Sequence, residues 1–333
     1  MFDRTSVGLD IGSKWIKLVA VGRSGDGGQL KTFGQTETPE GLVENGLVND
    51  PETVGAELGK LVEQLKLKGK KTISALSGQQ VYTRLMTLPA MPIEDMRTAA
   101  LYQSTSFLPI SVDDVTSDIL PVRQMEDQEG KKEEVFFVAA RKTQVENLLK
   151  TCQIGGLNLT TVEIEALALN TLYRSYFISD KVYGIINIGA QRSYLSVFQD
   201  QTLVFNRAIG FGCSAFYDQI PKLAGNEISL EELDAEEHEC QGILGELIDE
   251  LARSLDYFRL QNSKDQINNM LICGGCARLG GIEPYLSRVL DMKVQVGNVE
   301  PLIKLPGNVS EAERTELRFE YPIALGLALR GGK

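Results

Sequence analysis

The stretch Val7-Gly8-Leu9-Asp10-Ile11-Gly12-Ser13 has a second copy of its pattern far along the chain, Gly184-Ile185-Ile186-Asn187-Ile188-Gly189-Ala190. The offset between the copies is 177 positions, from 10 to 187 and again from 12 to 189. In each copy an apolar strand runs into a glycine turn and then into a strand of alternating apolar residues, which predicts a β-hairpin. A single hairpin of this kind recurs by chance, but two at a constant offset predict an α/β fold of two related domains that face one another.

The composition is that of a folded protein of about two domains. The 333 residues are 43% hydrophobic and 24% charged, and the net charge of −11 argues against binding to nucleic acid or an anionic membrane. No run of about 18 apolar residues predicts a membrane-spanning helix. We therefore expect a cytosolic chain, with no direct membrane insertion, that reaches a membrane through a partner. The five dispersed cysteines are expected to be reduced thiols: Cys152, Cys213, Cys240, Cys273 and Cys276.

Periodicity and breaker residues place the remaining elements. Helices are predicted at 51–66, 93–107, 142–152, 166–177, 243–261, 281–290 and 322–329, and a further helix from Cys213 that Pro221 ends or kinks, followed by an acidic segment at 227–239. Strands are predicted at 71–76, 80–88, 114–123, 134–140, 159–164 and 267–273. This alternation of helices and strands is typical of an α/β fold.

The turn after the first strand has the chemistry of a phosphate loop. Asp10 ends the strand and can hold Mg²⁺ through water, while Gly12 lets the backbone approach a ligand closely. Lys14 and Lys17 add positive charge nearby. Taken alone, Asp10 is better explained as a turn-forming residue. The turn after Asn187 would offer the same backbone donors from the opposite domain, with a plain hairpin turn as the alternative.

A third motif follows a later apolar strand, where Gly274 and Gly275 lead into a helix start. Paired glycines let a flat base or a ribose lie against the backbone, and Arg278 could stack on that base or be a solvated helix-start residue. The spacing of Cys273 and Cys276 suits a redox or zinc site, but the chain has no second such pair and one histidine, His238. The three motifs together predict a nucleotide site.

These motifs, in this order, resemble the phosphate-1, phosphate-2 and adenosine motifs of the actin/Hsp70/sugar-kinase superfamily. The resemblance implies an actin-like (ribonuclease H-like) duplicated fold with ATP and Mg²⁺ in the cleft between two domains. Within the superfamily the chain resembles the type IV pilus assembly PilM family, which is related to FtsA. The stretches that carry this resemblance are 84–92 (RLMTLPAMP), 106–110 (SFLPI), 136–142 (FFVAARK), 253–258 (RSLDYF) and 324–328 (ALGLA).

The resemblance also implies a division into subdomains, including the 1C subdomain that PilM and FtsA share. The implied boundaries are 1–87 for subdomain 1A, 88–161 for the 1C insertion and 162–181 for a return helix of 1A. They continue with 182–225 for subdomain 2A, 226–265 for 2B, and 266–333 for the rest of 2A with a C-terminal helix that returns to 1A.

Carried over residue by residue, the resemblance implies nucleotide contacts at Asp10, Gly12, Ser13, Lys14, Lys17, Asn187, Gly189, Gln191, Gly210, Gly212, Glu250, Gly274, Gly275 and Arg278. Asp10 would hold the metal and take part in catalysis. Glu165 matches the position that orients the attacking water, although a helix-start glutamate stabilised by the helix dipole is an equal alternative. Asn187 stands where the superfamily usually has Asp, so we expect nucleotide binding with slow hydrolysis at most.

The resemblance implies a cytoplasmic scaffold of the pilus platform at the inner membrane. It would bind the cytoplasmic N-terminal peptide of PilN in a groove between 1A and 1C, with walls at 81–88 and 93–107. Other platform proteins, the motor ATPase or a second copy of the chain are further partners to consider. One alternative is a small-molecule kinase, for which the insertion offers no clearly suited Asp. The other is an FtsA-like filament protein, which generally ends in an amphipathic targeting helix that this sequence lacks.

Overall fold

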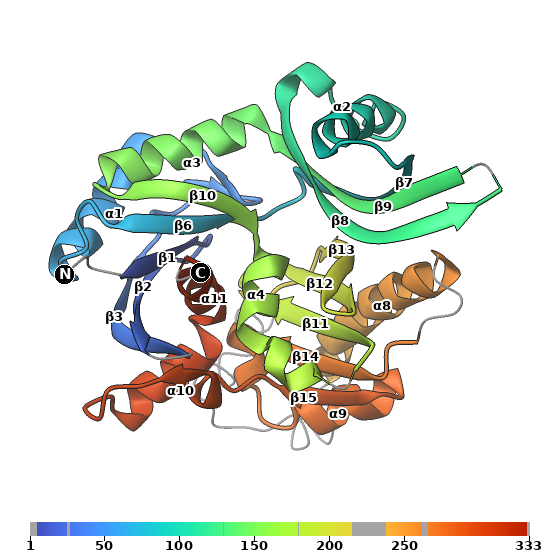
Figure 1. Ribbon diagram of the computed structural model, residues 1–333. Coiled ribbons are helices and arrows are strands. Elements are labelled where there is room, and N and C mark those ends of the chain that lie inside the picture. The colour runs from blue at the N-terminus through green and yellow to red at the C-terminus, as the bar shows by residue number, and fades with distance from the viewer. Residues whose placement is uncertain are drawn as a thin grey trace.

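A computed structural model describes residues 5–24, 27–128, 130–178, 180–214, 238–261 and 266–331. Its first large sheet has the strand order β10-β6-β1-β2-β3-β16 (Figure 1). The first three strands in the chain form an antiparallel meander, and β6 and β10 continue the sheet in parallel. The strands span Ser6–Ile11 (β1), Trp15–Ser24 (β2), Gly27–Glu37 (β3), Lys71–Leu76 (β6), Asn158–Ile164 (β10) and Ile303–Lys304 (β16).

The second large sheet repeats this arrangement with the order β13-β12-β11-β14-β15. Again three strands form a meander and the next two are parallel to its first strand. The strands span Val182–Ile188 (β11), Ser193–Gln199 (β12), Thr202–Ile209 (β13), Asn269–Cys273 (β14) and Lys293–Val296 (β15). The register repeats as well, because Asp10 lies opposite Lys17 and Asn187 lies opposite Tyr194, both 177 positions later. The predicted duplication is confirmed.

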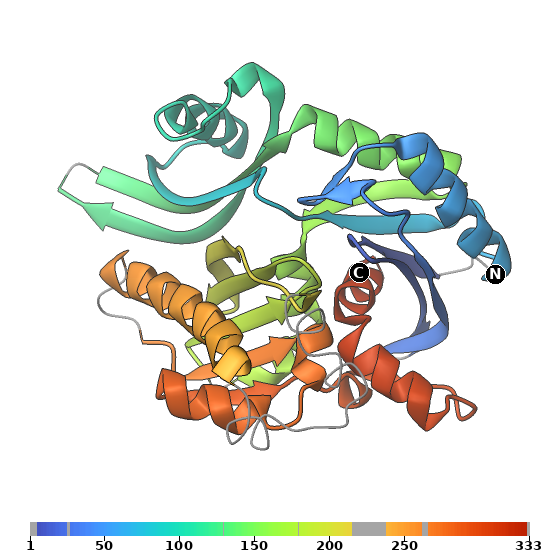
Figure 2. The ribbon, with the colours of Figure 1, turned by 180° about the vertical axis from the view of Figure 1, so that it is seen from behind.

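Helices cover both faces of the two sheets. Figure 1 shows α11 (Pro322–Arg330) between the first sheet and α4 (Glu165–Tyr173). Figure 2 shows the opposite face of the second sheet covered by α8 (His238–Gln261) and α9 (Ile282–Leu290). The contact of α11 with its neighbours is backbone to backbone: a Cβ on Gly8 of β1 would collide with the carbonyl of Ala324, and one on Gly326 with that of Ala168. The two glycines therefore allow this helix to be fully enclosed.

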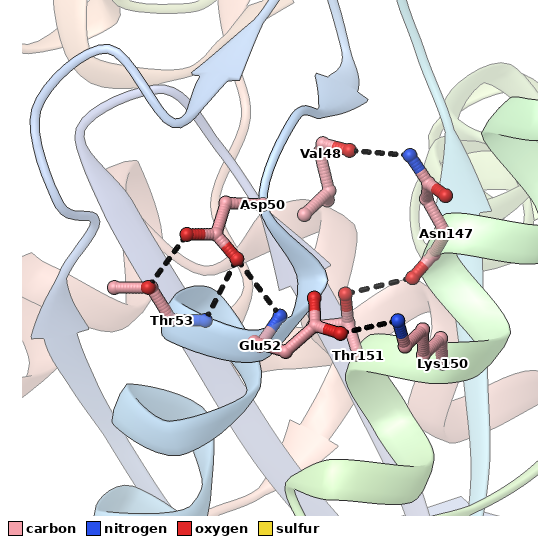
Figure 3. Close-up of polar contacts among 7 residues, drawn as sticks. All are labelled: Val48, Asp50, Glu52, Thr53, Asn147, Lys150 and Thr151. Carbon is pink, nitrogen blue, oxygen red and sulfur yellow. Dashed lines mark hydrogen bonds and ion pairs between the residues drawn. The ribbon is translucent and has the colours of Figure 1, made fainter.

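The helices α1 (Pro51–Gln64) and α3 (Lys142–Ile154) pack on the outer face of the first sheet. Asp50 caps α1 by accepting hydrogen bonds from the backbone N–H groups of Glu52 and Thr53, both at 3.1 Å (Figure 3). Lys150 of α3 forms an ion pair with Glu52. Figure 3 shows how this cap and ion pair join the start of α1 to α3.

A smaller three-stranded sheet, β7-β9-β8, projects beside the first sheet, over the edge of the second (Figure 1). Its strands span Val81–Pro89 (β7), Val115–Asp127 (β8) and Gly130–Arg141 (β9), and α2 (Ile93–Ser104) packs on one of its faces. The remaining elements are short: β4 (Val43–Glu44), β5 (Leu47–Val48), α10 (Glu311–Phe319), and 3-10 helices at Val112–Asp114, Arg174–Phe177, Gly275–Arg278 (η3) and Glu300–Leu302.

The structure departs from the sequence predictions in a few places. The helix α8 begins at His238, ahead of the predicted 243, and α4 ends at Tyr173, where a 3-10 helix continues to Phe177. The strands β4, β5 and β15 and the helix α10 were not predicted. The predicted helix after Cys213 and the acidic segment lie almost wholly outside the described residues. The prediction that all cysteines are reduced is wrong, since Cys213 and Cys276 form a disulfide that brings two distant segments together.

Candidate functional site

A cavity of about 260 Å³ lies between the two large sheets, where both hairpin turns meet. Of the residues predicted to bind nucleotide or to act in catalysis, the cavity is lined by Asp10, Gly12, Ser13, Lys14, Lys17, Glu165, Asn187, Gly189, Gln191, Gly274 and Gly275. These residues come from four separate parts of the chain. The fold therefore brings all three sequence motifs to one place.

The two hairpin turns have the same internal geometry. The N–H of Gly12 donates to the carbonyl of Trp15 at 2.9 Å, and the N–H of Gly189 donates to that of Arg192, also at 2.9 Å. Within the part of the chain that is described, the next two N–H groups of each turn have no hydrogen-bond acceptor; they belong to Ser13, Lys14, Ala190 and Gln191. Unpaired backbone N–H groups in a tight turn attract anions. Each turn can therefore bind an oxyanion such as a phosphate.

The carboxyl groups of Asp10 and Glu165 are buried in the cavity, and this raises their pKa values. Burial raises the pKa of Asp10, and Lys17 opposes that shift. Burial, and to a lesser extent the neighbouring Asp10, raise the pKa of Glu165 to about 8. The side-chain amide of Asn187 donates to Oε2 of Glu165 at 3.2 Å. Glu165 therefore carries a proton at neutral pH in this structure, and it cannot take one from a water molecule.

Two side chains of the second hairpin connect the two sides of the cavity: Arg192, which the resemblance implies near the second phosphate loop, and Tyr194, which was not predicted. Tyr194 stands in the second hairpin where Lys17 stands in the first, and its hydroxyl accepts from the N–H of Gly78 at 2.5 Å. The Nε of Arg192 donates to Oδ1 of Asn45 at 2.9 Å. These two bonds join the second hairpin to loops of the first sheet. The 177-residue offset from Lys17 was a signal that could have identified Tyr194.

A further acidic residue of the cavity also comes from a distant part of the chain. Glu320, just before α11, places Oε2 3.5 Å from Nζ of Lys17. Lys17 therefore lies between two carboxylates, because Asp10 is opposite it in the β1–β2 ladder. Among the described residues, no group of three or more His, Cys, Asp or Glu side chains is arranged to hold a metal ion. A cation here would need oxygen ligands from a bound molecule or from water in addition to Asp10.

The glycine motif is held against the second hairpin. Gly274 has φ of 91°, and a Cβ there would collide with the carbonyl of Ile188. The segment after β13 lies on the other side of the same turn, where the N–H of Cys213 donates to the carbonyl of Gly189 at 2.9 Å. The second turn is thus enclosed by two glycine-containing segments.

Four predicted nucleotide contacts do not line the cavity. Glu250 forms an ion pair with Arg253 at 2.7 Å on α8, and Arg278 places its guanidinium 5.7 Å from the ring centre of Phe319. Among the described residues, nothing lies within 4 Å of a Cβ built on Gly210, whereas Gly212 packs against the backbone of the second turn. Gly212 therefore shapes that turn without lining the cavity itself.

A second cavity, of about 780 Å³, lies between the three-stranded sheet and the elements β13 and α8. It is therefore not the implied groove between 1A and 1C, although it shares residues with the predicted walls of that groove. The hydroxyl of Thr83 joins its two sides by donating to the carbonyl of Asn206 at 3.1 Å. The predicted groove walls contribute Thr83, Arg84, Leu85 and Phe107 to it, and the opposite side includes Phe205, Asn206, Arg207 and Tyr257. Its chemistry is mixed. The guanidinium of Arg84 lies 4.5 Å from the ring centre of Phe107, and Arg207 lies 5.7 Å from that of Tyr257. Apolar and hydrogen-bonding groups are thus available to one ligand.

Comparison with solved structures identifies the fold. The chain is similar to ethanolamine utilization protein EutJ from Carboxydothermus hydrogenoformans, with a TM-score of 0.53, 16% identity, and 98% of this chain and 89% of that chain covered. The similarity to the structure described as "PilM-PilN type IV pilus biogenesis complex" is stronger: the TM-score is 0.85 and the identity 26%, over 98% of both chains. The predicted actin-like α/β fold is confirmed.

The described part of the chain contains no helix that is both long and apolar enough to cross a membrane. The family model described as "Type IV pilus assembly protein PilM" matches residues 8–332, which is nearly the whole sequence. The recognition from the sequence motifs is therefore confirmed, and the chain belongs to the type IV pilus assembly protein PilM family.

Proposed function

We propose that this chain is a nucleotide-binding scaffold of a type IV pilus platform. It binds ATP with Mg²⁺ in the cleft between the large sheets and a partner's N-terminal peptide in the groove beside the three-stranded sheet. The observation that carries the nucleotide half is the matched pair of turns, each with two backbone N–H groups that have no acceptor in the described part of the chain. Two opposed anion sites suit a chain of phosphates between them.

The residues present fit this ligand. Mg²⁺ is usually held by one or two carboxylates together with phosphate oxygens and water, so Asp10 alone is a sufficient protein ligand. Lys14 and Lys17 would balance phosphate charge, and the backbone at Gly274 and Gly275 leaves room for the nucleoside. A bound metal ion would supply charge neutralisation at the phosphates.

Hydrolysis by this site is expected to be slow. Glu165 is the candidate for orienting water, but it is protonated at neutral pH and bonded to Asn187. A second carboxylate at position 187 would add negative charge next to a metal ion, and the amide adds none. Both features favour nucleotide binding over nucleotide hydrolysis.

The peptide half of the proposal rests on the second cavity. The similar solved structure is that of a PilM–PilN complex, and the 780 Å³ groove has the size and the mixed lining that suit an extended segment. Apolar side chains of the peptide would contact Leu85 and Phe205, while a backbone N–H of the peptide could donate to the hydroxyl of Thr83, whose own proton is given to the carbonyl of Asn206. Through such a membrane-bound partner the protein would act in the cytoplasm at the inner membrane.

Calorimetric titration with ATP tests the nucleotide half, in Mg²⁺ and again in EDTA. We expect wild type to bind with Mg²⁺ and Asp10→Asn to lose most of that affinity. Asp95→Asn is a matched control, because Asp95 is exposed on α2 and outside the cleft. An absence of binding by wild type, or equal Mg²⁺-dependent binding by Asp10→Asn, would disprove the proposal.

Fluorescence anisotropy with a labelled N-terminal PilN peptide tests the second half. Leu85→Glu places a charge in the groove and is expected to weaken binding about tenfold or more, since a buried apolar contact is replaced by a charge. Leu149→Glu is the control, because this leucine is 45% exposed on α3. If both variants bind as wild type does, the peptide lies elsewhere.

A further inference from the structure

A disulfide connects two of the segments that enclose the cleft. Cys213 follows β13 and Cys276 lies in η3, directly after the paired glycines, and their Cα atoms are 5.5 Å apart across 63 positions of sequence. This Cα separation is common in protein disulfides. Both side chains are buried, with exposed fractions of 4% for Cys213 and 0% for Cys276. Cys213 lines the nucleotide cavity and Cys276 does not, so Cys213 is the member of the pair that faces the cleft.

The position of the bond makes it relevant to the ligand. The N–H of Ser214 donates to the carbonyl of Ala190 at 2.8 Å, next to the bond from Cys213 to Gly189. A Cβ on Gly275 would lie 3.8 Å from Sγ of Cys213. The disulfide therefore ties the segment that supports the second phosphate turn to the glycine motif that faces the nucleoside. Without it, backbone hydrogen bonds and packing hold these segments together.

The other two thiols that the structure describes, Cys152 and Cys273, are less suited to thiol–disulfide exchange at the cleft. Burial raises the pKa of Cys152 to about 12, and it raises that of Cys273 as well. The thiolate is the reactive form, and neither of these two thiols lines the cavity, whereas Cys213 does. The reduced form of the pair is also accommodated, because Sγ of Cys213 lies 3.5 Å from the carbonyl oxygen of Ile188 and can donate to it.

We propose that Cys213 and Cys276 form a reversible redox lock on the nucleotide cleft, and that oxidation slows nucleotide release. This rests on the nucleotide-binding function proposed above. Glutathione disulfide is a suitable oxidant: the Cys213 thiolate attacks it and releases one glutathione, and the Cys276 thiolate then displaces the second from the mixed disulfide. Two thiols are oxidised, one glutathione disulfide is reduced to two glutathiones, and the two protons of the protein thiols pass through solvent to the two glutathione thiolates. A bound nucleotide covers Cys213 and therefore slows both the oxidation and the reduction of the pair.

The first measurement counts thiols in the denatured full-length protein after treatment with reduced or oxidised glutathione. The chain has five cysteines, so five thiols are expected after reduction and three after oxidation. Intact mass should fall by two hydrogens, and peptide mapping should join 213 to 276. Five thiols after oxidation, or a different pairing, would overturn the proposal.

The second measurement follows release of a fluorescent ATP analogue with Mg²⁺ present, chased with unlabelled ATP. We expect oxidised wild type to release it about tenfold more slowly than reduced wild type, a coupling in the usual range. Cys213→Ser should release it at one rate under both treatments, and Cys152→Ser should behave as wild type. Equal rates for the two forms of wild type would overturn the lock. If neither form binds the nucleotide analogue, the nucleotide site itself is refuted and the lock with it. This holds even if the thiol count shows that the disulfide forms.

Discussion

The buried carboxyl of Glu165 predicts an unusual dependence of stability on pH. Its pKa is 4.5 in the unfolded chain and about 8 in the folded protein, because burial and the nearby Asp10 disfavour its charged form. Between these values the folded state holds a proton that the unfolded state has lost. The stabilising contribution is therefore complete below pH 4.5 and is lost as the pH rises through 8. Glu165→Gln removes this titration, and its carbonyl can still accept from Asn187.

The magnitude follows from linkage. Wild type loses about 1 kcal/mol of this contribution at pH 5 and about 4 kcal/mol at pH 8. The Glu165→Gln variant has no such loss, so its free energy of unfolding should exceed that of wild type by about 1 kcal/mol at pH 5 and by about 4 kcal/mol at pH 8. For a chain of 333 residues, an unfolding entropy of about 0.7 kcal/mol/K turns them into Tm differences of about 1 °C and about 6 °C.

Scanning calorimetry of both proteins without nucleotide, at pH 5 and pH 8, measures this difference. Other titrating groups are shared by the two proteins and cancel. Glu146→Gln is the matched control, since Glu146 is exposed on α3 and should show the wild-type Tm at both pH values. A Tm difference between Glu165→Gln and wild type that stays constant from pH 5 to pH 8 would refute the assignment of a protonated, buried Glu165.

Three further predictions concern the cleft and the helix beneath it. Asn187→Asp should raise Mg²⁺-dependent ATP hydrolysis about tenfold by adding charge at the metal; unchanged phosphate release would count against the account of slow turnover. Arg192→Ala removes the bond to Asn45 across the cleft, so stopped-flow mixing should show faster nucleotide association, whereas an unaltered rate means that this bond does not limit entry. Gly326→Ala forces a Cβ against Ala168 and should cost about 2 kcal/mol in urea unfolding; a wild-type midpoint would contradict the packing of α11.

The parts of the fold that could be predicted are those with a local signal. Both hairpins combine alternating apolar residues with a glycine turn, and the constant offset of 177 positions between them indicates the duplication. The strands β4, β5 and β15 are too short for a periodic pattern. The helix α10 is mostly polar and buries one residue, Leu317, but Ser310 and Glu313 form a capping box before and within its first turn. That Ser-x-x-Glu pattern is readable in a sequence and was missed.

Within the site, the backbone loops could be predicted and several side chains could not. Glycines and turn residues are positioned by their own strands, so residues such as Gly12 and Gly189 meet as the motifs imply. Arg278 depends instead on Phe319, which α10 brings from a distant part of the chain. Glu320 and the disulfide depend in the same way on which segments the fold places side by side. Long-range packing of this kind leaves no periodic signal.

The proposed function requires one nucleotide to be held between the two equivalent turns. Hydrogen–deuterium exchange of the backbone amides, with and without Mg-ATP, is the measurement that tests this arrangement. The arrangement predicts that the segments 12–14 and 189–191, which contain the unpaired N–H groups, both become protected at the same ATP concentration, and that Asp10→Asn loses both effects together. Protection of one turn alone, or of neither, would contradict it.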